Sequence, residues 1–398
     1  MRILALTNLY PNPLQPHRAA FNRHRFRFLA ETNELRLVAP VSWREEWALR
    51  GRGAKIPRGR RTTCDGIPVE HPRYWYTPGV LRSQYGRFFQ ASVAGAFARA
   101  VHELAPDVVL ATWAYPDGWA AVRLARRHGL PVVVLVHGSD VRRMDEFPAR
   151  ARGTREALRS ADGVIAVSAD LAARVVALGA EPDRVATILD GVDRSLFHPG
   201  DRDAARRGVG FDDGRRHLLF IGNLLPVKGV DVLLQACATL AAQRTDWRLH
   251  LVGDGPERAR LAAQAQALGI DAKMVFHGSR AHAELPEWLR AVDLFVLPSR
   301  SEGIPNVLLE ASACATPWVA SDVGGIPEIV SLGAGTLVPP EQPDALADAL
   351  ARGLDAPPPI PANGPRDRRE AVAEIARFLR HSADRARVSR LLSPSAAG

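Results

Sequence analysis

Two carboxylates bracket a predicted strand-to-helix turn in the stretch Leu297–Glu310. The apolar run Leu294–Leu297 predicts a buried strand, and Pro305 predicts the first turn of a helix, where a missing N–H costs nothing. The free amides of such a turn attract anions, phosphates in particular. Glu302 lies in the turn, and Glu310 can lean back toward it because helical Cβ atoms tilt toward the N-terminus. The acids suit sugar or ribose hydroxyls, or are merely solvated surface acids.

A lysine follows another predicted strand, in Phe220-Ile-Gly-Asn-Leu-Leu-Pro-Val-Lys-Gly229. Gly222 permits close backbone approach, and Lys228 could reach a phosphate or could lie on an ordinary surface turn. Weaker glycine turns supply further candidates, namely Gly253, Gly278 and Arg280, the last two beside a possible nucleotide base. The sequence has no Walker A loop and no complete GxGxxG after its first strand, which disfavours P-loop hydrolases and dinucleotide dehydrogenases.

A histidine in the first half of the chain is a candidate for acid–base or hydrogen-bonding work. His137 directly follows the apolar run Val132–Val136, so it should lie at the carboxyl end of a buried strand. A structural histidine is the alternative. Ser168 ends a similar run and could contact phosphate, or could cap the following helix.

Apolar strands alternate with helical segments twice along the chain, which predicts two α/β domains with doubly wound parallel sheets. Ligands of such sheets bind at the carboxyl ends of the strands. A stretch rich in Pro, Gly and charge around 194–216 predicts a linker, and residues 43–90 read as irregular acceptor-binding loops. We therefore expect domains at 1–197 and 198–355, then a Pro-rich connector and an amphipathic helix in 356–398 that packs back or lies in solvent.

Composition indicates a globular protein of a reducing compartment. Apolar residues make up 46% and charged residues 24% of the 398 positions, and the three cysteines are far apart without a CxxC pair. No apolar run approaches the roughly 20 residues of a membrane span, and the N-terminus does not resemble a signal peptide. We expect a cytoplasmic protein.

The net charge of +9 is concentrated in the first domain. Residues 1–197 hold 29 Lys/Arg and 19 Asp/Glu, and the excess peaks in Arg44–Arg61, near Trp43 and Trp47. Basic residues beside aromatic ones suit the anionic inner face of the plasma membrane, whereas a solvated arginine-rich face is the alternative. No nucleic-acid fold signature accompanies the patch, so a nucleic-acid partner is not expected.

Five motifs, in this order along the chain, resemble the retaining family-4 glycosyltransferases of GT-B fold: VHGSD with His137, the connector GVDRSLFHP, PVKGVDVLLQA, LVGDGPER and SEGIPNVLLEA. The resemblance covers most of the chain and is strongest in 218–330. It implies two Rossmann-like domains facing across a cleft, an acceptor domain first and a nucleotide-sugar domain second. It also implies site roles. Lys228 would bind the donor diphosphate, Glu302 the sugar hydroxyls, Glu310 the ribose and His137 the transferred sugar, with Gly303, Ile304, Pro305 and Asn306 around sugar and phosphate.

Three positions depart from the family pattern. Asn223 occupies a donor-binding position where many members have Arg, so one diphosphate cation is missing unless another Arg replaces it. Asp190 stands where Asn is usual before Gly191. The first loop has Arg18-Ala-Ala20 in place of a common Gly-Gly, which puts the acceptor side in question.

The residues and the resemblance together predict a retaining, metal-independent glycosyltransferase of the hexosyltransferase type. It would need no cofactor besides its UDP- or GDP-linked sugar donor, and would extend a saccharide or lipid-linked saccharide. The segments PRYWYTPG and GNLLPVKG most resemble members that assemble exopolysaccharide and teichuronic acid. A nucleotide-sugar epimerase of the same fold and a non-catalytic sugar-nucleotide-binding protein are the alternatives.

Overall fold

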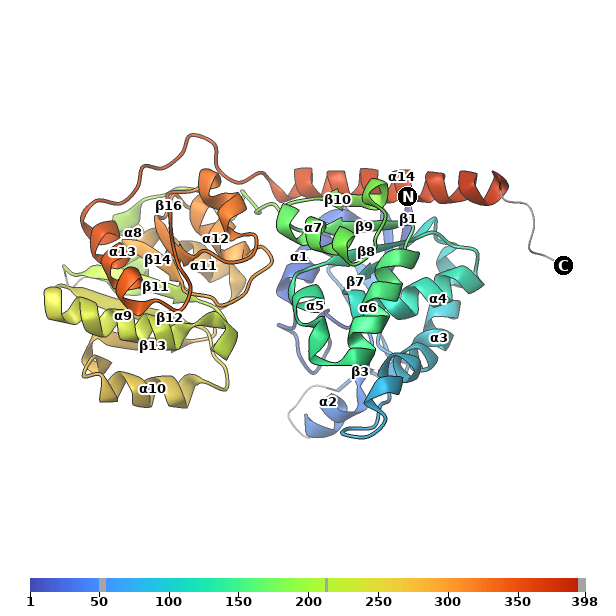
Figure 1. The fold of residues 1–398 in the computed structure, drawn as a ribbon, viewed down its shortest axis with the longest axis horizontal. Coiled ribbons are helices and arrows are strands. Elements are labelled where there is room, and N and C mark those ends of the chain that lie inside the picture. Colours follow the sequence, from blue (N-terminus) through green and yellow to red (C-terminus); the bar gives the residue numbers. More distant parts are fainter. Residues whose placement is uncertain (50–54, 212–213, 393–398) are drawn as a thin grey trace. The chain divides into compact units, whose positions relative to one another are not determined.

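The computed structural model describes residues 1–49, 55–211 and 214–392. The chain divides into two compact units, the first made of Met1–Leu189 with Arg369–Gly398 and the second of Asp190–Arg368 (Figure 1). Each unit is built on a largely parallel sheet whose strands are connected through helices. The predicted fold class, two doubly wound α/β domains, is therefore confirmed. The division differs from the predicted boundaries in assigning the end of the chain to the first unit.

The first unit holds a sheet in the order β10-β9-β8-β7-β1-β2-β5-β4. Its pairs are parallel except for the antiparallel hairpin of β4 and β5. The central strands are buried along their whole length because both faces are covered, and their sequences are accordingly apolar throughout. The strands are β1 (Arg2–Leu6), β2 (Glu34–Val38), β4 (Arg61–Cys64), β5 (Ile67–Glu70), β7 (Val108–Thr112), β8 (Val132–Val136), β9 (Gly163–Ala166) and β10 (Val185–Thr187), with β3 (Val41–Ser42) and β6 (Arg73–Tyr74) paired separately.

Helices of the first unit begin with recognisable sequence signals. Ser42 and Glu45 form a capping box at the start of α2, and Pro148 opens α6, where a proline at the first position is tolerated. The helices are α1 (Ala20–Ala30), α2 (Trp43–Ala48), α3 (Tyr85–Leu104), α4 (Trp119–Arg127), α5 (Ser139–Arg142), α6 (Pro148–Ser160) and α7 (Ala169–Ala177).

The second unit holds a wholly parallel sheet in the order β13-β12-β11-β14-β15-β16. Its strands are β11 (Arg216–Ile221), β12 (Trp247–Val252), β13 (Met274–Gly278), β14 (Leu294–Leu297), β15 (Trp318–Ser321) and β16 (Gly335–Val338). Its helices are α8 (Arg202–Val209), α9 (Val230–Gln243), α10 (Arg258–Ala267), α11 (Leu285–Ala291), α12 (Asn306–Ala313) and α13 (Pro343–Asp355). The order changes direction between β11 and β14, and the carboxyl ends of strands at such a switch point commonly bind ligands.

Two predictions of irregular structure were wrong. Residues 43–90 were expected to be irregular, yet β4 and β5 extend the sheet there, because edge strands tolerate polar residues on their exposed face. The stretch 194–216 was expected to be a linker, yet α8 lies within it, and the Asp201 carboxylate caps that helix by accepting from Ala204 N–H at 3.0 Å. Residues 50–54 of the basic stretch Arg44–Arg61 lie outside the described residues.

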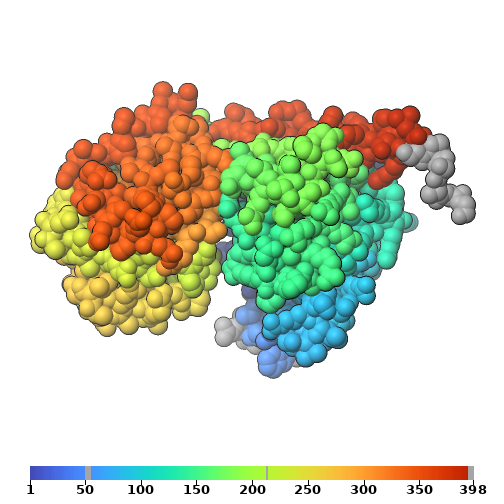
Figure 2. Space-filling view, viewed as in Figure 1, coloured from blue at the N-terminus to red at the C-terminus, as the bar shows by residue number. Residues whose placement is uncertain are grey.

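The predicted C-terminal helix forms α14 (Arg368–Leu392) and packs on the first unit. Arginines fix it there: Arg369 pairs with Glu31 at 2.9 Å, and Arg385 donates to the Asp162 carbonyl at 2.8 Å. Figure 2 shows this helix, in red, along the green surface of the first unit. Within the described part of the chain, no helix has both the length and the apolar character that crossing a membrane requires.

Three histidines on adjacent strands form a hydrogen-bonded row in the core of the second unit. His217 Nδ1 lies 3.0 Å from His250 Nε2, and His250 Nδ1 lies 2.9 Å from His277 Nε2. Burial, together with the charges of neighbouring His217 and His277, lowers the pKa of His250 to about 2. Burial and the nearby Arg280 lower the pKa of His277 to about 4. Both rings are therefore neutral in the folded protein at neutral pH.

We expect this row to make the second unit less stable in mild acid. In the unfolded chain both rings titrate near pH 6.5, so below that pH the unfolded state binds protons that the folded state does not. The stability that the neutral rings contribute is fully present above pH 6.5. The part due to His277 is lost as the pH falls toward 4, where its ring is protonated in the folded protein as well. Between pH 7.5 and 5.5 each ring should cost up to about 1.4 kcal/mol in the free energy of unfolding.

Urea unfolding at these two pH values measures the loss. Burial raises the pKa of Asp117 and of Asp140, so these carboxyls act in the opposite sense and the test must compare variants. His277→Gln should have a smaller pH dependence than the parent protein. An equal pH dependence in both would show that the ring does not titrate as described.

Candidate functional site

Lys228 and Glu302, which follow neighbouring strands of the second unit, form an ion pair. Because β11 and β14 pair in parallel, the loops after them leave the same edge of the sheet. Lys228 Nζ donates to Glu302 Oε1 at 2.6 Å, and Ser299 Oγ donates to the same oxygen at 2.7 Å. The side chains are only 23% and 11% exposed. An ammonium group has three donors, so Lys228 keeps two for a phosphate, while Glu302 Oε2 remains able to accept from a hydroxyl.

Arg300 fastens the lysine loop to the glutamate loop. Its backbone N–H donates to the Val227 carbonyl at 2.8 Å, and its guanidinium binds both carboxylate oxygens of Asp231 at 2.9 Å. A second carboxylate, Glu341, accepts from Arg300 Nε at 2.8 Å. Such bidentate pairs fix geometry as well as charge. Arg300 therefore holds Lys228 and Glu302 in register.

The amino end of α12 lies directly after Glu302. Pro305 is its N-cap residue, so the first amides of the helix have no partner within it and can serve an anion. Gly303 and Ile304 form the short connection, and the Gly303 carbonyl accepts from Gly325 N–H at 2.9 Å. Asn306 Oδ1 is buried without a hydrogen-bond partner among the described residues. A buried polar atom of this kind usually indicates a missing partner.

Glu310 pairs with a histidine that the sequence analysis missed. Glu310 is 4% exposed, and its Oε1 lies 2.8 Å from His282 Nε2. The ring of Phe197 packs against His282, with 5.0 Å between ring centroids. The pairing fixes the Glu310 carboxylate within α12, the helix that follows Glu302. No sequence motif marks His282, because the contact joins the turn before α11 to helix α12, 28 residues further along the chain.

Glycines at three strand ends meet beside this site. Gly253 N–H donates to the Gly278 carbonyl at 2.8 Å, and a Cβ at Gly253 would lie 1.9 Å from the Gly222 carbonyl oxygen. This close approach explains why the strand ends carry glycine. Asn223 is exposed at the end of β11. The guanidinium carbon of Arg280 lies 5.5 Å from the centroid of the Trp288 ring.

His137 lies in the first unit, at the carboxyl end of β8. Its ring packs edge-on against Phe21, with 4.8 Å between centroids, and its backbone N–H donates to Asp140 Oδ1 at 3.1 Å. The same carboxylate accepts from Gly138 N–H at 2.9 Å and from Ala114 N–H at 3.1 Å. Asp140 thereby joins the ends of β7 and β8 and orients the histidine loop. It was not predicted as a site residue.

Two further polar residues at this edge of the first sheet are buried and accept backbone hydrogen bonds. Asp117 is fully buried, burial raises its pKa well above the usual range, and its Oδ2 accepts from Asn8 N–H at 3.3 Å. Sequence reasoning missed it. Ser168 is also fully buried, and its Oγ accepts from Leu171 N–H at 3.1 Å. The capping interpretation of Ser168 accounts for this geometry without a ligand.

The structure thus gathers most predicted donor residues at one edge of the second unit. Lys228, Glu302, Gly303 and Asn306 meet there, with Gly253 and Gly278 on the adjoining strands. His137 and Ser168 belong to the first unit. Among the residues that the structure describes, no three His, Cys, Asp or Glu side chains are grouped to hold a metal ion. Independence from a metal remains a prediction about the reaction.

Comparison with known families matches both halves of the chain. Residues 201–377 match the family described as Glycosyl transferases group 1, and residues 47–196 match Glycosyltransferase Family 4. D-inositol 3-phosphate glycosyltransferase 2 of Catenulispora acidiphila is 38% identical over 280 residues, which are 67% of this chain and 64% of that protein. The chain spans between 50% and 64% of the length of the first curated relatives it matches.

Solved structures show the same fold at low sequence identity. Sucrose-phosphate synthase from Thermosynechococcus elongatus superposes with a TM-score of 0.74 and 20% identity, over 98% of this chain and 99% of that one. Anabaena Alr3699/HepE in complex with UDP and glucose superposes with a TM-score of 0.69 and 21% identity, over 99% and 100%. These likenesses establish the architecture.

Proposed function

We propose that this chain transfers a sugar from a nucleotide-diphosphate donor to a hydroxyl-bearing acceptor. The proposal is based on the two glycosyltransferase domains that make up most of the chain. They match family 4 in residues 47–196 and group 1 in residues 201–377. The bond between the sugar's anomeric carbon and the diphosphate breaks, and a bond to the acceptor oxygen forms. The acceptor loses a proton, and the nucleoside diphosphate leaves. We propose retention of configuration, as the family resemblance implies.

One observation carries the proposal: the Lys228–Glu302 pair lies directly before the amino end of α12. Negative charge develops on the diphosphate as it leaves, and positive groups already in place stabilise that charge most effectively. Lys228 and the first amides of α12 are such groups. Glu302 accepts hydrogen bonds from hydroxyls of the donor sugar, and Glu310, held by His282, accepts from the ribose. In this scheme the cationic side chain and the helix amides do the work that a metal ion does elsewhere.

His137 is proposed to contact the transferred sugar, with Asp140 as its positioning residue. Asp140 acts only through the loop, because its carboxylate accepts three backbone N–H groups and does not reach outward. Since the structurally similar HepE was solved in complex with UDP, a UDP-sugar is the first donor to test.

Two classes of acceptor are compatible with the proposed reaction. The relatives are named for D-inositol 3-phosphate, which makes a phosphorylated small molecule one candidate. A saccharide or lipid-linked saccharide in cell-surface polysaccharide assembly is the other, and the basic first domain suits contact with an anionic membrane from the cytoplasmic side. Part of that charge is internally neutralised, since Arg61 pairs with Glu103 at 2.8 Å and Arg60 pairs with Glu46.

A thermal-shift panel of UDP-, GDP- and ADP-sugars tests the donor. A ligand that binds only the folded state stabilises it by about 2.7 kcal/mol at 100 times its Kd. We expect one nucleotide class to raise the melting temperature of the parent protein and of Lys273→Met, and to have little effect on Lys228→Met. Lys273 is a suitable control because it lies in the same unit and donates to the Thr245 carbonyl, away from the site. Equal shifts in both variants would refute the assigned phosphate site.

A further inference from the structure

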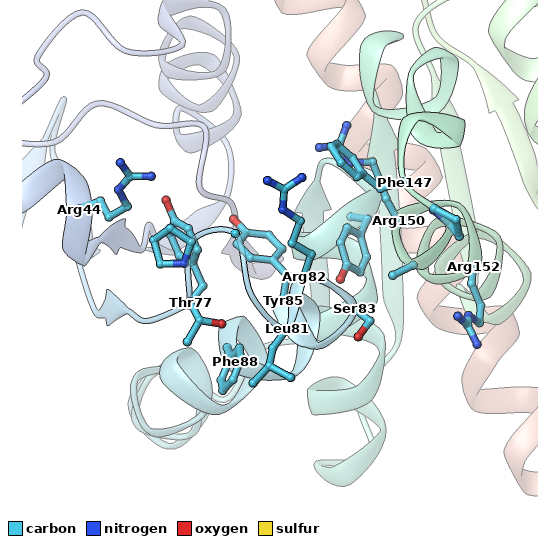
Figure 3. A pocket seen from close by; sticks show the side chains of 16 residues that line it. Arg44, Thr77, Leu81, Arg82, Ser83, Tyr85, Phe88, Phe147, Arg150 and Arg152 are labelled. Carbon is cyan, nitrogen blue, oxygen red and sulfur yellow. The ribbon is translucent and has the colours of Figure 1, made fainter.

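A pocket of about 520 Å³ opens in the first unit, and His137 is not among the residues that line it (Figure 3). Its volume falls within the range of about 300–1,000 Å³ that is usual for small-molecule sites. Four segments line it: the loop and helix start around 76–88, Phe147 with the start of α6, Arg44 on α2, and Tyr115 after β7. All belong to the first unit. The residues given roles so far do not line it.

Aromatic packing builds the wall of this pocket. Trp43, the first residue of α2, donates its indole N–H to the Tyr76 carbonyl at 2.9 Å and stacks on Trp75 with 5.8 Å between centroids. Tyr85 packs edge-on against Tyr76, with centroids 5.3 Å apart. These contacts hold Arg44 and the loop Thr77–Gln84 against the start of α3. The pocket is therefore a built feature of the fold.

The lining is predominantly apolar, and its rim exposes hydrocarbon to solvent. Leu81 is 55% exposed and the neighbouring Val80 is 65% exposed. Phe88 and Phe147 continue the apolar wall. Large apolar side chains exposed together beside a pocket commonly mark a binding site. The surface suits a flexible hydrocarbon chain better than a sugar ring, whose hydroxyls would lose their hydrogen bonds to water here.

Arginines gather on one side of the same pocket. The guanidinium groups of Arg82 and Arg150 lie 5.6 Å and 5.2 Å from the centroid of the Phe147 ring. In the view of Figure 3, Arg44, Arg82 and Arg150 lie along one side, with Leu81 and Phe88 on the other. Two cations around one ring repel each other, so an anion between them would stabilise the arrangement.

The charge of this cluster is largely uncompensated. Among the described residues, Arg44 and Arg82 have no carboxylate partner, and Arg150 has only Glu146 at 3.5 Å, where the carboxylate is 39% exposed. An exposed pair of that length contributes little. Elsewhere in the unit, arginines are paired more closely, as in Arg23 with Asp65 at 2.8 Å. The pocket thus combines free cations with an apolar interior.

We propose that this pocket binds a lipid phosphate, with the phosphate on Arg82 and Arg150 and the start of the hydrocarbon chain against Leu81 and Phe88. This inference rests on the proposed function, because it assigns the acceptor to the lipid-linked class. Guanidinium groups bind phosphate through paired, charge-assisted hydrogen bonds, and the adjoining apolar wall removes the first methylene groups from water. A free sugar phosphate would use the arginines and leave the apolar half of the pocket unoccupied.

Titration calorimetry with farnesyl phosphate, below its micelle-forming concentration, tests the pocket on the full chain. Farnesol lacks the phosphate, and inorganic phosphate and D-inositol 3-phosphate lack the chain. We expect farnesyl phosphate to bind at least 10-fold more tightly than any of the three. The variant Arg82→Gln/Arg150→Gln should weaken its binding about 10-fold or more, since each charge-assisted hydrogen bond exceeds the free energy of a tenfold change.

Arg127→Gln is the matched control, because Arg127 is an exposed arginine of α4 in the same unit that does not line the pocket. Leu81→Asp, at an exposed position that should fold normally, tests the apolar half and should also weaken binding. Unchanged affinity in the double arginine variant, or D-inositol 3-phosphate binding as tightly as farnesyl phosphate, would overturn the inference. Donor binding is measured separately by nucleotide-sugar thermal shift. A donor shift without lipid binding would refute only the lipid pocket, and lipid binding without any donor shift would refute the proposed transferase.

Discussion

Replacing Lys228 with methionine, or Glu302 with glutamine, is expected to lower sugar transfer by about 100-fold or more. Loss of one donor placed at developing charge typically costs 10²–10³ in rate. Lys228→Met removes such a donor and also leaves the Glu302 carboxylate, whose side chain is 11% exposed, without its cation. Glu302→Gln keeps the shape of the side chain but loses the charged acceptor for sugar hydroxyls. Initial rates with a radiolabelled donor measure both variants.

The sizes of the two losses in rate, and the way in which they combine in a double variant, test the proposed mechanism. Because Lys228 and Glu302 hydrogen-bond each other at 2.6 Å, their effects should not add, and the double variant should be less impaired than the product of the single losses. Glu341→Gln is the matched control: Glu341 also accepts a hydrogen bond from a cation of this loop, Arg300, but its carboxylate is 64% exposed. Rates within threefold of the parent in both single variants would contradict the site.

This pair could be predicted from sequence because both residues follow apolar runs. Phe220 and Leu294–Leu297 belong to strands that are buried on both faces, and such strands are readable without an alignment. Parallel neighbours then bring residues 74 positions apart to one edge of the sheet. The prediction required only that β11 and β14 be adjacent, which the usual doubly wound order favours.

Other parts of the site depend on contacts that no local pattern marks. His282 meets Glu310 because the turn before α11 packs against helix α12, and Asp140 accepts a hydrogen bond from Ala114 at a different strand end. The polar edge strand β4, Arg61–Cys64, lacks an apolar run, because none of its residues is buried at this edge of the sheet. For the pocket lined by aromatic residues and arginines, the sequence showed only a basic stretch near tryptophans. Its geometry came from packing.

Gly229 shows how the lysine motif depends on a residue without a side chain. Its φ is +64°, and a Cβ there would lie 1.9 Å from the Pro298 carbonyl oxygen. This contact lets the loop that carries Lys228 approach the loop that carries Glu302. Alanine at this position would have to push the two loops apart, and so would separate the ion pair as well as strain the backbone.

We therefore expect Gly229→Ala to destabilise the second unit more than Gly269→Ala. Gly269 has nearly the same φ, +69°, but its Cβ would meet nothing within 4 Å. The left-handed conformation alone costs alanine about 1–2 kcal/mol at either position. Overpacking should add about 1–3 kcal/mol at Gly229 only. Urea unfolding of both variants measures the difference, and sugar transfer should fall in Gly229→Ala while Gly269→Ala remains active. Equal free energies of unfolding would mean that the two loops separate freely, in which case the fold does not hold Lys228 against Glu302 and the site must be assembled by the donor itself.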